Sequence, residues 1–172
     1  MPVTYDKAAS ARPYLEAMLR EHHPSLVDAK VTFDLLFATP EYDEKTGLPK
    51  SPPVKHGGYP AAATVKICSL KDRAKGCADV EIVIDGPEWR GLSESRRHAL
   101  IDHELTHLEF TGEYDDAYRP KLKMRLHDHQ FGWFDEVARR HGDASYEVRQ
   151  FETFRHSQSY FAFVGGPEPA VA

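Results

Sequence analysis

The alternation of apolar and polar positions along the chain predicts several short β-strands. The clearest is 79–85, where Val80, Ile82 and Ile84 occupy every second position and leave the other face largely polar. Segments rich in β-branched and aromatic residues, or strictly alternating, predict three more strands. These are 31–37, 61–68 and 121–126.

An apolar repeat every three to four residues predicts helices between and after these strands. The first begins near Pro13, whose missing N–H costs least in a first turn, and ends before Pro24. Ser93 and Asp128 are candidate N-caps of two later helices. The predicted helices are 10–23, a segment that contains the apolar run 99–109, 129–142, and a last one after 144.

These elements predict an α+β domain. We expect a small mixed or antiparallel sheet of about three to four strands, packed against the helix at 99–109 and about two or three further helices. The long connection 39–59 is rich in Pro, Gly and charged residues, and its end could close over a cleft, although a solvated loop is the simpler expectation. We expect one domain over 1–164 and a disordered tail over 165–172.

Composition narrows the class of protein. The chain has 172 residues, of which 41% are hydrophobic and 28% charged, as in ordinary globular domains. A net charge of −5 gives no electrostatic footprint for nucleic acid. No apolar run could span a membrane, and the N-terminus has no signal-peptide character, so we expect a cytoplasmic monomer. The two cysteines, Cys68 and Cys77, are expected to be reduced thiols rather than a disulfide.

The apolar run 99–109 carries candidate chemistry, because it contains the pattern His-Glu-x-x-His. His103 and His107 are four residues apart, so on a helix both imidazoles lie on one face and can converge on one ion. Glu104 can reach a water on that ion and act as its general base. Two solvated histidines on a surface helix would be the alternative, but the apolar flanks argue for burial. The pattern predicts one catalytic zinc ion.

A catalytic zinc needs a third protein ligand from elsewhere in the chain. His127 is the favoured candidate, because an extended arm meets a helix start there. His129 is its close rival, and an acidic residue of the segment 113–116 is a further possibility. His141 is expected to interact with a helix C-terminus instead.

Hydrolysis also needs a donor to the developing oxyanion, and the candidates are Tyr114, Tyr118, Arg125 and His129. Asp102 or Asp79 could orient a ligand histidine through its second ring nitrogen. The strand 80–85 could offer an edge to which an extended substrate adds.

The segment 103–107 followed by His127-Asp128-His129-Gln130-Phe131 resembles the SprT-like minimal zincins, although Asp128 stands where those proteins have glycine. A longer resemblance, over about residues 30–142, is to the putative phage metallopeptidase family. It is carried by segments at 58–62, 69–73, 78–85 and 120–128. The resemblance implies a minimal zincin-like fold, a phage or prophage origin, a bacterial host cytoplasm and a zinc-dependent peptidase.

Three functions compete. The first is a zinc metallopeptidase with a protein or peptide substrate. The second is a zinc-dependent amide hydrolase with a non-protein substrate such as peptidoglycan. The third is a non-catalytic binding protein that keeps the same scaffold. A DNA-dependent protease is a special case of the first, and the acidic net charge counts against it.

Overall fold

A computed structural model describes residues 3–128 and 132–153 of the chain. The strands are β1 (Thr4–Lys7), β2 (Phe33–Thr39), β3 (Lys55–His56), β4 (Tyr59–Pro60), β5 (Ala63–Ile67), β6 (Val80–Asp85), β7 (Leu108–Tyr114) and β8 (Pro120–Met124). The helices are α1 (Arg12–His22), α2 (Pro24–Asp28), α3 (Leu70–Ala74), α4 (Gly86–Gly91), α5 (Glu94–Thr106), α6 (Asp135–His141), the short 3₁₀ turns η1 (Ala9–Ala11) and η2 (Gly142–Ala144), and a final helical segment, 146–153. The expected tail at 165–172 lies outside the described residues, so the domain division stays a prediction.

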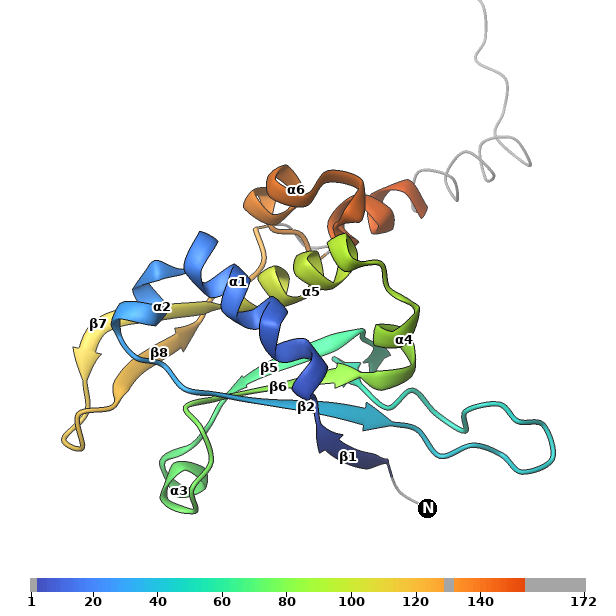
Figure 1. Cartoon of the computed structure of the whole chain (residues 1–172), viewed down its shortest axis with the longest axis horizontal. Helices are drawn as coiled ribbons and strands as arrows, with labels where there is room; N and C mark the ends of the chain where they lie inside the picture. Colours follow the sequence, from blue (N-terminus) through green and yellow to red (C-terminus); the bar gives the residue numbers. More distant parts are fainter. Residues whose placement is uncertain (1–2, 129–131, 154–172) are drawn as a thin grey trace, which may run out of the picture.

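The main sheet has four strands in the order β1-β2-β6-β5. β2 and β6 are parallel, whereas β1 and β5 pair antiparallel with their neighbours, so the sheet is mixed. Helices α1 and α5 cover one face of it (Figure 1). β3 with β4 and β7 with β8 form two small separate hairpins. The predicted α+β class with a small mixed sheet is therefore confirmed.

The sequence-based expectation of a free edge at 80–85 is wrong. β6 pairs with β2 on one side and β5 on the other, so its backbone groups are used within the sheet. Its apolar face fits that central position, because Val80, Ile82 and Ile84 are each 0% exposed. The last strand of the sheet is instead β5.

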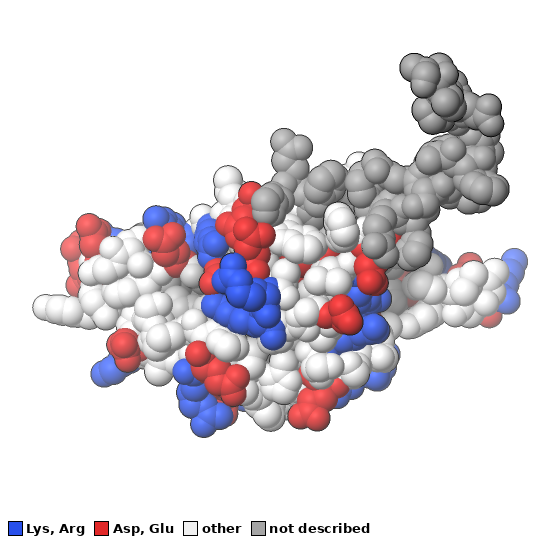
Figure 2. Space-filling view, turned by 90° about the horizontal axis from the view of Figure 1, so that it is seen from above, with Lys and Arg blue, Asp and Glu red and all other residues white. Residues whose placement is uncertain are grey.

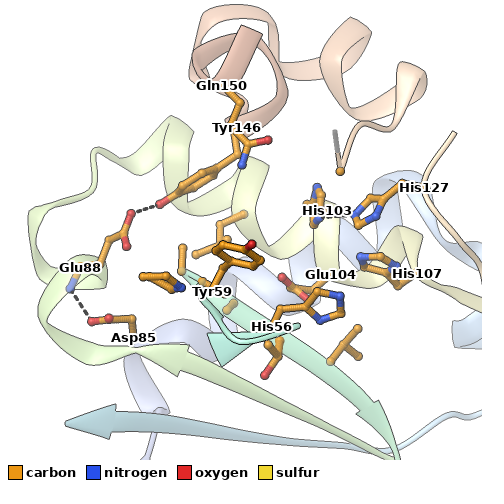
Figure 3. Close-up of a pocket in the computed structure, with 18 of the residues that line it drawn as sticks. His56, Tyr59, Asp85, Glu88, His103, Glu104, His107, His127, Tyr146 and Gln150 are labelled. Atoms are coloured by element: carbon orange, nitrogen blue, oxygen red, sulfur yellow. Dashed lines mark hydrogen bonds between the residues drawn. The ribbon is translucent and has the colours of Figure 1, made fainter. Parts of the chain in front are cut away.

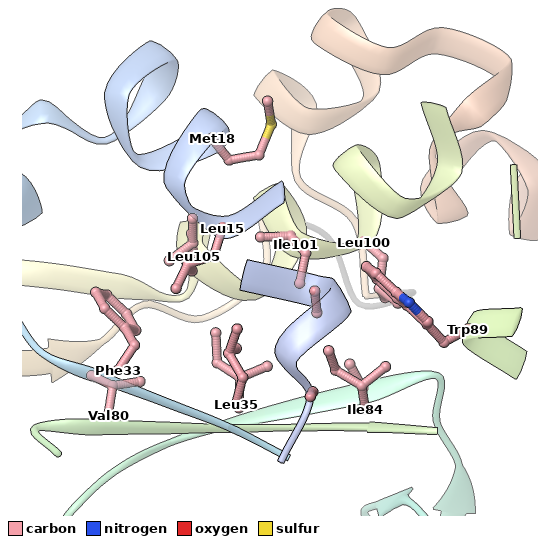
Figure 4. Packing of buried hydrophobic residues seen from close by; sticks show 14 of the residues in the cluster. Leu15, Met18, Phe33, Leu35, Val80, Ile84, Trp89, Leu100, Ile101 and Leu105 are labelled. Carbon is pink, nitrogen blue, oxygen red and sulfur yellow. The ribbon is translucent and has the colours of Figure 1, made fainter. Parts of the chain in front are cut away.

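The core lies between this sheet and the two helices (Figure 4). Leu15 of α1, together with Ile101 and Leu105 of α5, packs above the β2 and β6 side chains. Ile101 and Leu105 are four residues apart and both 0% exposed, as the helical repeat predicts. Burial of this stripe holds α5 against the sheet.

Helix α5 begins as the sequence predicts but ends earlier. The Ser93 side chain accepts the backbone N–H of Arg96, which is an N-cap contact. The helix ends at Thr106, with His107 as its C-cap, and Leu108 already pairs with Met124 in the β7–β8 hairpin. The apolar residue Leu108 is therefore buried in a strand and not in the helix predicted over 99–109.

The helix predicted over 129–142 is also shorter than expected. Residues 129–131 lie outside the described part, and α6 begins only at Asp135. Gly132 has φ +72°, a left-handed conformation that a continuous helix does not allow. Asp128 still accepts the backbone N–H of Asp135, so the predicted capping residue acts across a loop.

Surface charge, the two cysteines and helix length can be compared with the expectations drawn from composition. On the face shown in Figure 2, basic and acidic side chains are interleaved, without a continuous basic area. Cys68 is buried and Cys77 is exposed, and the two are not bonded to each other in this structure. Within the described ranges, no helix has the length and apolar character that crossing a membrane requires.

Candidate metal centre

The two histidines of the helical motif lie at the C-terminal end of α5. His103 is in the last turn, and His107 caps the helix where the chain enters β7. Their ring centroids are 5.2 Å apart. Both imidazoles therefore face the same space, as the spacing predicts.

The β7–β8 hairpin brings a third histidine to this pair. The chain leaves β8 alongside the end of α5, where the backbone N–H of Arg125 donates to the carbonyl of His107 at 2.7 Å. Two residues later, Nε2 of His127 lies 3.3 Å from Nε2 of His103. One ring nitrogen from each of the three histidines lies within 4.8 Å of the other two. The structure thus brings together His103, His107 and the favoured third candidate (Figure 3).

The second ring nitrogens of the first two histidines are held by the protein. Nδ1 of His103 lies 2.7 Å from Oε1 of the buried Glu147, and Nδ1 of His107 lies 2.9 Å from the carbonyl oxygen of Arg125. An acceptor at Nδ1 keeps the proton there and leaves the Nε2 lone pair free for an ion.

This donor set fits a zinc ion. Zinc prefers imidazole nitrogens at 2.0–2.1 Å in tetrahedral geometry, which puts two such ligands about 3.3–3.4 Å apart. The 3.3 Å between the Nε2 atoms of His103 and His127 agrees with that separation. Three histidines also leave one position for water, as in catalytic sites.

Phe134 supports the three rings from the protein side. It is 0% exposed, and its ring centroid lies 4.7–5.1 Å from the centroids of His103, His107 and His127. An apolar floor of this kind limits water access and fixes the orientation of the rings.

Glu104 lies beside the three histidines and lines the same pocket. Its side chain is buried, and burial raises the pKa of Glu104 to about 7, against a smaller opposite effect of His103. A carboxyl group with a pKa near neutrality suits a general base better than an ordinary glutamate does.

The histidines differ in their affinity for protons. Burial, together with the neighbouring histidines, lowers the pKa of His107 to about 4 and also lowers the pKa of His127. For His103 burial acts in the same direction, but the contact with Glu147 and the nearby Glu104 raise its pKa overall. Neutral imidazole at His107 and His127 is the form that binds a metal.

The pocket in front of the histidines has a volume of about 590 Å³, within the range of ligand sites. Its wall includes the segment 61–65, which enters and runs along β5. His56 and Tyr59 reach it from the β3–β4 hairpin, and Tyr146 lies at the opposite end from the three histidines (Figure 3). The end of the long connection 39–59 therefore borders this pocket.

The other predicted site residues are not assembled here. Arg125 does not line the pocket, because its guanidinium binds Glu136 and Asp128. Tyr114 and Tyr118 are 47% and 89% exposed and also lie away from the pocket. His129 lies outside the described residues.

Neither predicted orienting aspartate contacts a candidate ligand. Asp79 binds the backbone and side chain of Thr32, while the fully buried Asp102 binds His23, His141 and Arg140. His141 lies in the last turn of α6, as the sequence predicts, and its ring also contacts the carboxylate of Asp102. Glu147 takes the orienting position instead. Sequence reasoning missed it because its separation of 44 residues from His103 leaves no local pattern.

His22, Asp102 and His141 form a second group with metal-binding side chains. Arg140 donates to both oxygens of Asp102 at 3.0 Å. Because this guanidinium already carries a positive charge at the carboxylate, binding of a metal cation there is disfavoured. Hydrogen bonds from His141, His23 and Arg140 hold the pKa of Asp102 well below its usual range, although burial alone would raise it. This group is an ion-paired junction between α1, α5 and α6.

Comparison with known proteins gives one result. A family model described as "Putative phage metallopeptidase" matches residues 7–154, which include the three histidines, Glu104 and Glu147. No curated protein and no solved structure gives a match to this chain.

Proposed function

The chain belongs to the putative phage metallopeptidase family, and on that premise we propose that it is a zinc-dependent peptidase. His103, His107 and His127 would hold one zinc ion, and Glu104 would act as general base. The observation that carries this proposal is the convergence of three imidazole nitrogens within 4.8 Å, beside a buried carboxylate in a pocket.

The chemistry follows from these positions. A bound zinc ion would supply Lewis acidity, which acidifies water and polarises the substrate carbonyl. Glu104 removes a proton from the attacking water while the water oxygen bonds to the carbonyl carbon and the C=O π pair moves to oxygen. Glu104 then gives this proton to the amide nitrogen, the carbonyl re-forms, and the C–N bond breaks with its electron pair on the leaving amine.

The substrate class follows from the shape of the site. β5 is the last strand of the sheet, and the segment 61–65 lines the pocket, so an extended peptide can add along it. The net charge of −5 and the interleaved charges on the face shown in Figure 2 support a protein or peptide substrate rather than nucleic acid.

The test compares zinc content and cleavage of labelled casein between wild type and Glu104→Gln. Both proteins should bind one zinc ion per chain, and cleavage should fall by about 10²–10⁴ in the variant. Glu109→Gln is the matched control, because Glu109 is an exposed β7 residue that pairs with Lys123. Wild type that binds no zinc, or Glu104→Gln that cleaves like wild type, contradicts the proposal.

A further inference from the structure

The proposed reaction needs a group that stabilises the oxyanion, and the sequence candidates do not supply one within the described pocket. Arg125 is held by acidic partners, and Tyr114 lies elsewhere. A single such donor contributes about 10²–10³ to kcat in hydrolases, so its identity matters for the mechanism.

Apart from the three candidate ligands, five described side chains that line the pocket can donate an N–H or O–H. Tyr146 donates its hydroxyl to Glu88 at the end away from the histidines (Figure 3). His56 is drawn beside Glu104 and His107 in that view. The five are His56, Tyr59, Thr64, Tyr146 and Gln150.

His56 also lines the same pocket as the candidate ligands His107 and His127. The group of mutually close ligand atoms nevertheless consists of His103, His107 and His127, without His56. His56 is thus near the centre without being one of its ligands.

The imidazole of His56 is available for a substrate. Among the described residues, no hydrogen-bond partner contacts its ring, and the side chain is exposed at the pocket rim. His56 pairs with Tyr59 across a tight turn, Gly57 and Gly58, with φ of +56° and +87°. A hairpin turn of this kind holds the ring at the mouth of the pocket, opposite α5.

We propose that His56 is a catalytic residue that donates a ring N–H to the oxyanion formed when water adds to the substrate carbonyl. The proton stays on His56, and the hydrogen bond strengthens as negative charge develops on the carbonyl oxygen. This role rests on the proposed peptidase function and assigns the donor that the sequence left open.

The experiment uses full-length zinc-loaded protein and the variants His56→Phe, His56→Gln and Lys55→Gln. His56→Phe should lower kcat on labelled casein by about 10²–10³ with KM changed by less than about threefold. His56→Gln keeps an N–H donor and should recover part of this loss. Lys55→Gln, at an exposed position of the same hairpin that does not line the pocket, is the matched control and should retain kcat.

Binding of a phosphinic pseudopeptide tests the same contact without turnover. Its tetrahedral oxygens mimic the oxyanion, so His56→Phe should weaken binding by a factor similar to the loss in kcat, with one zinc ion still bound per chain. Unchanged kcat and unchanged inhibitor binding in His56→Phe would overturn the proposal, as would loss of zinc from that variant. Failure of the peptidase function itself is separate, because it appears as inactivity of wild type or full activity of Glu104→Gln.

Discussion

Nδ1 of His103 lies 2.7 Å from Oε1 of Glu147, although the two residues are 44 positions apart. Glu147 is 1% exposed, and its other oxygen has no hydrogen-bond partner among the described residues. Burying a carboxylate that has a single hydrogen-bond partner costs free energy of folding, so the fold keeps Glu147 there for its contact with His103. It fixes the tautomer and the direction of the first candidate ligand.

Glu147→Gln should therefore weaken zinc binding about 10–100-fold while the fold is retained. Competition with a chelator of known affinity measures the change. Glu152→Gln, an exposed position in the same helical segment, serves as the control and should bind zinc like wild type. Equal zinc affinity of wild type and Glu147→Gln would show that the contact does not position the ligand.

The third ligand can be decided by a pair of substitutions. His127→Ala removes a ring nitrogen that lies 3.3 Å from Nε2 of His103. Zinc affinity should therefore fall by more than about 100-fold, which exceeds the loss expected for Glu147→Gln, a residue that contacts a ligand but not the ion. His129→Ala should leave zinc affinity close to that of wild type. Metal analysis after dialysis gives the answer, and the opposite pattern would assign the third ligand to His129.

Local patterns predicted the parts of this molecule that depend on local physics. The alternation at Val80, Ile82 and Ile84 and the N-cap Ser93 are both confirmed, because each depends on burial or hydrogen bonding within a few residues. The spacing of His103 and His107 predicted their convergence for the same reason.

Long-range pairing was not predictable in this way. The central place of β6 depends on which strands flank it, and the end of α5 depends on Leu108 finding a partner strand. The contact of Glu147 with His103 and that of Asp102 with His23 join segments 44 and 79 residues apart. No short stretch of the sequence contains both partners of any of these pairings.

The Asp102 junction makes a prediction about stability. Asp102→Asn should lower the free energy of unfolding by about 3 kcal/mol, because Arg140 loses the buried one of its two carboxylate partners and keeps only Glu136. The folded-state pKa of Asp102 is depressed, so its contribution is present above the unfolded pKa of about 3.9. It is lost as the pH falls through the folded-state pKa.

Urea denaturation of wild type and Asp102→Asn between pH 3 and pH 8 measures this contribution. The difference should be constant from about pH 5 upward and shrink below about pH 4. Asp28→Asn, at an exposed position of α2, should change stability by less than about 0.5 kcal/mol. A difference that is independent of pH would mean that the charge of Asp102 is not what stabilises the junction.

Glu104 makes the opposite prediction for metal-free protein. Its folded-state pKa of about 7 lies above the unfolded value of about 4.3, so the folded protein retains a proton that the unfolded chain releases. The contribution of Glu104 to the free energy of unfolding therefore falls as the pH rises from about 4.3 to 7 and is then constant. Glu104→Gln carries no ionisable group there and should be more stable than wild type by about 2–4 kcal/mol at pH 8, but by only about 1 kcal/mol at pH 5.

Denaturation of chelator-treated wild type and Glu104→Gln at pH 5 and pH 8 measures this difference in stability. Zinc should reduce the difference at pH 8, because a nearby cation favours the carboxylate. A difference that is equal at both pH values would show that Glu104 is ionised in the metal-free protein throughout this range.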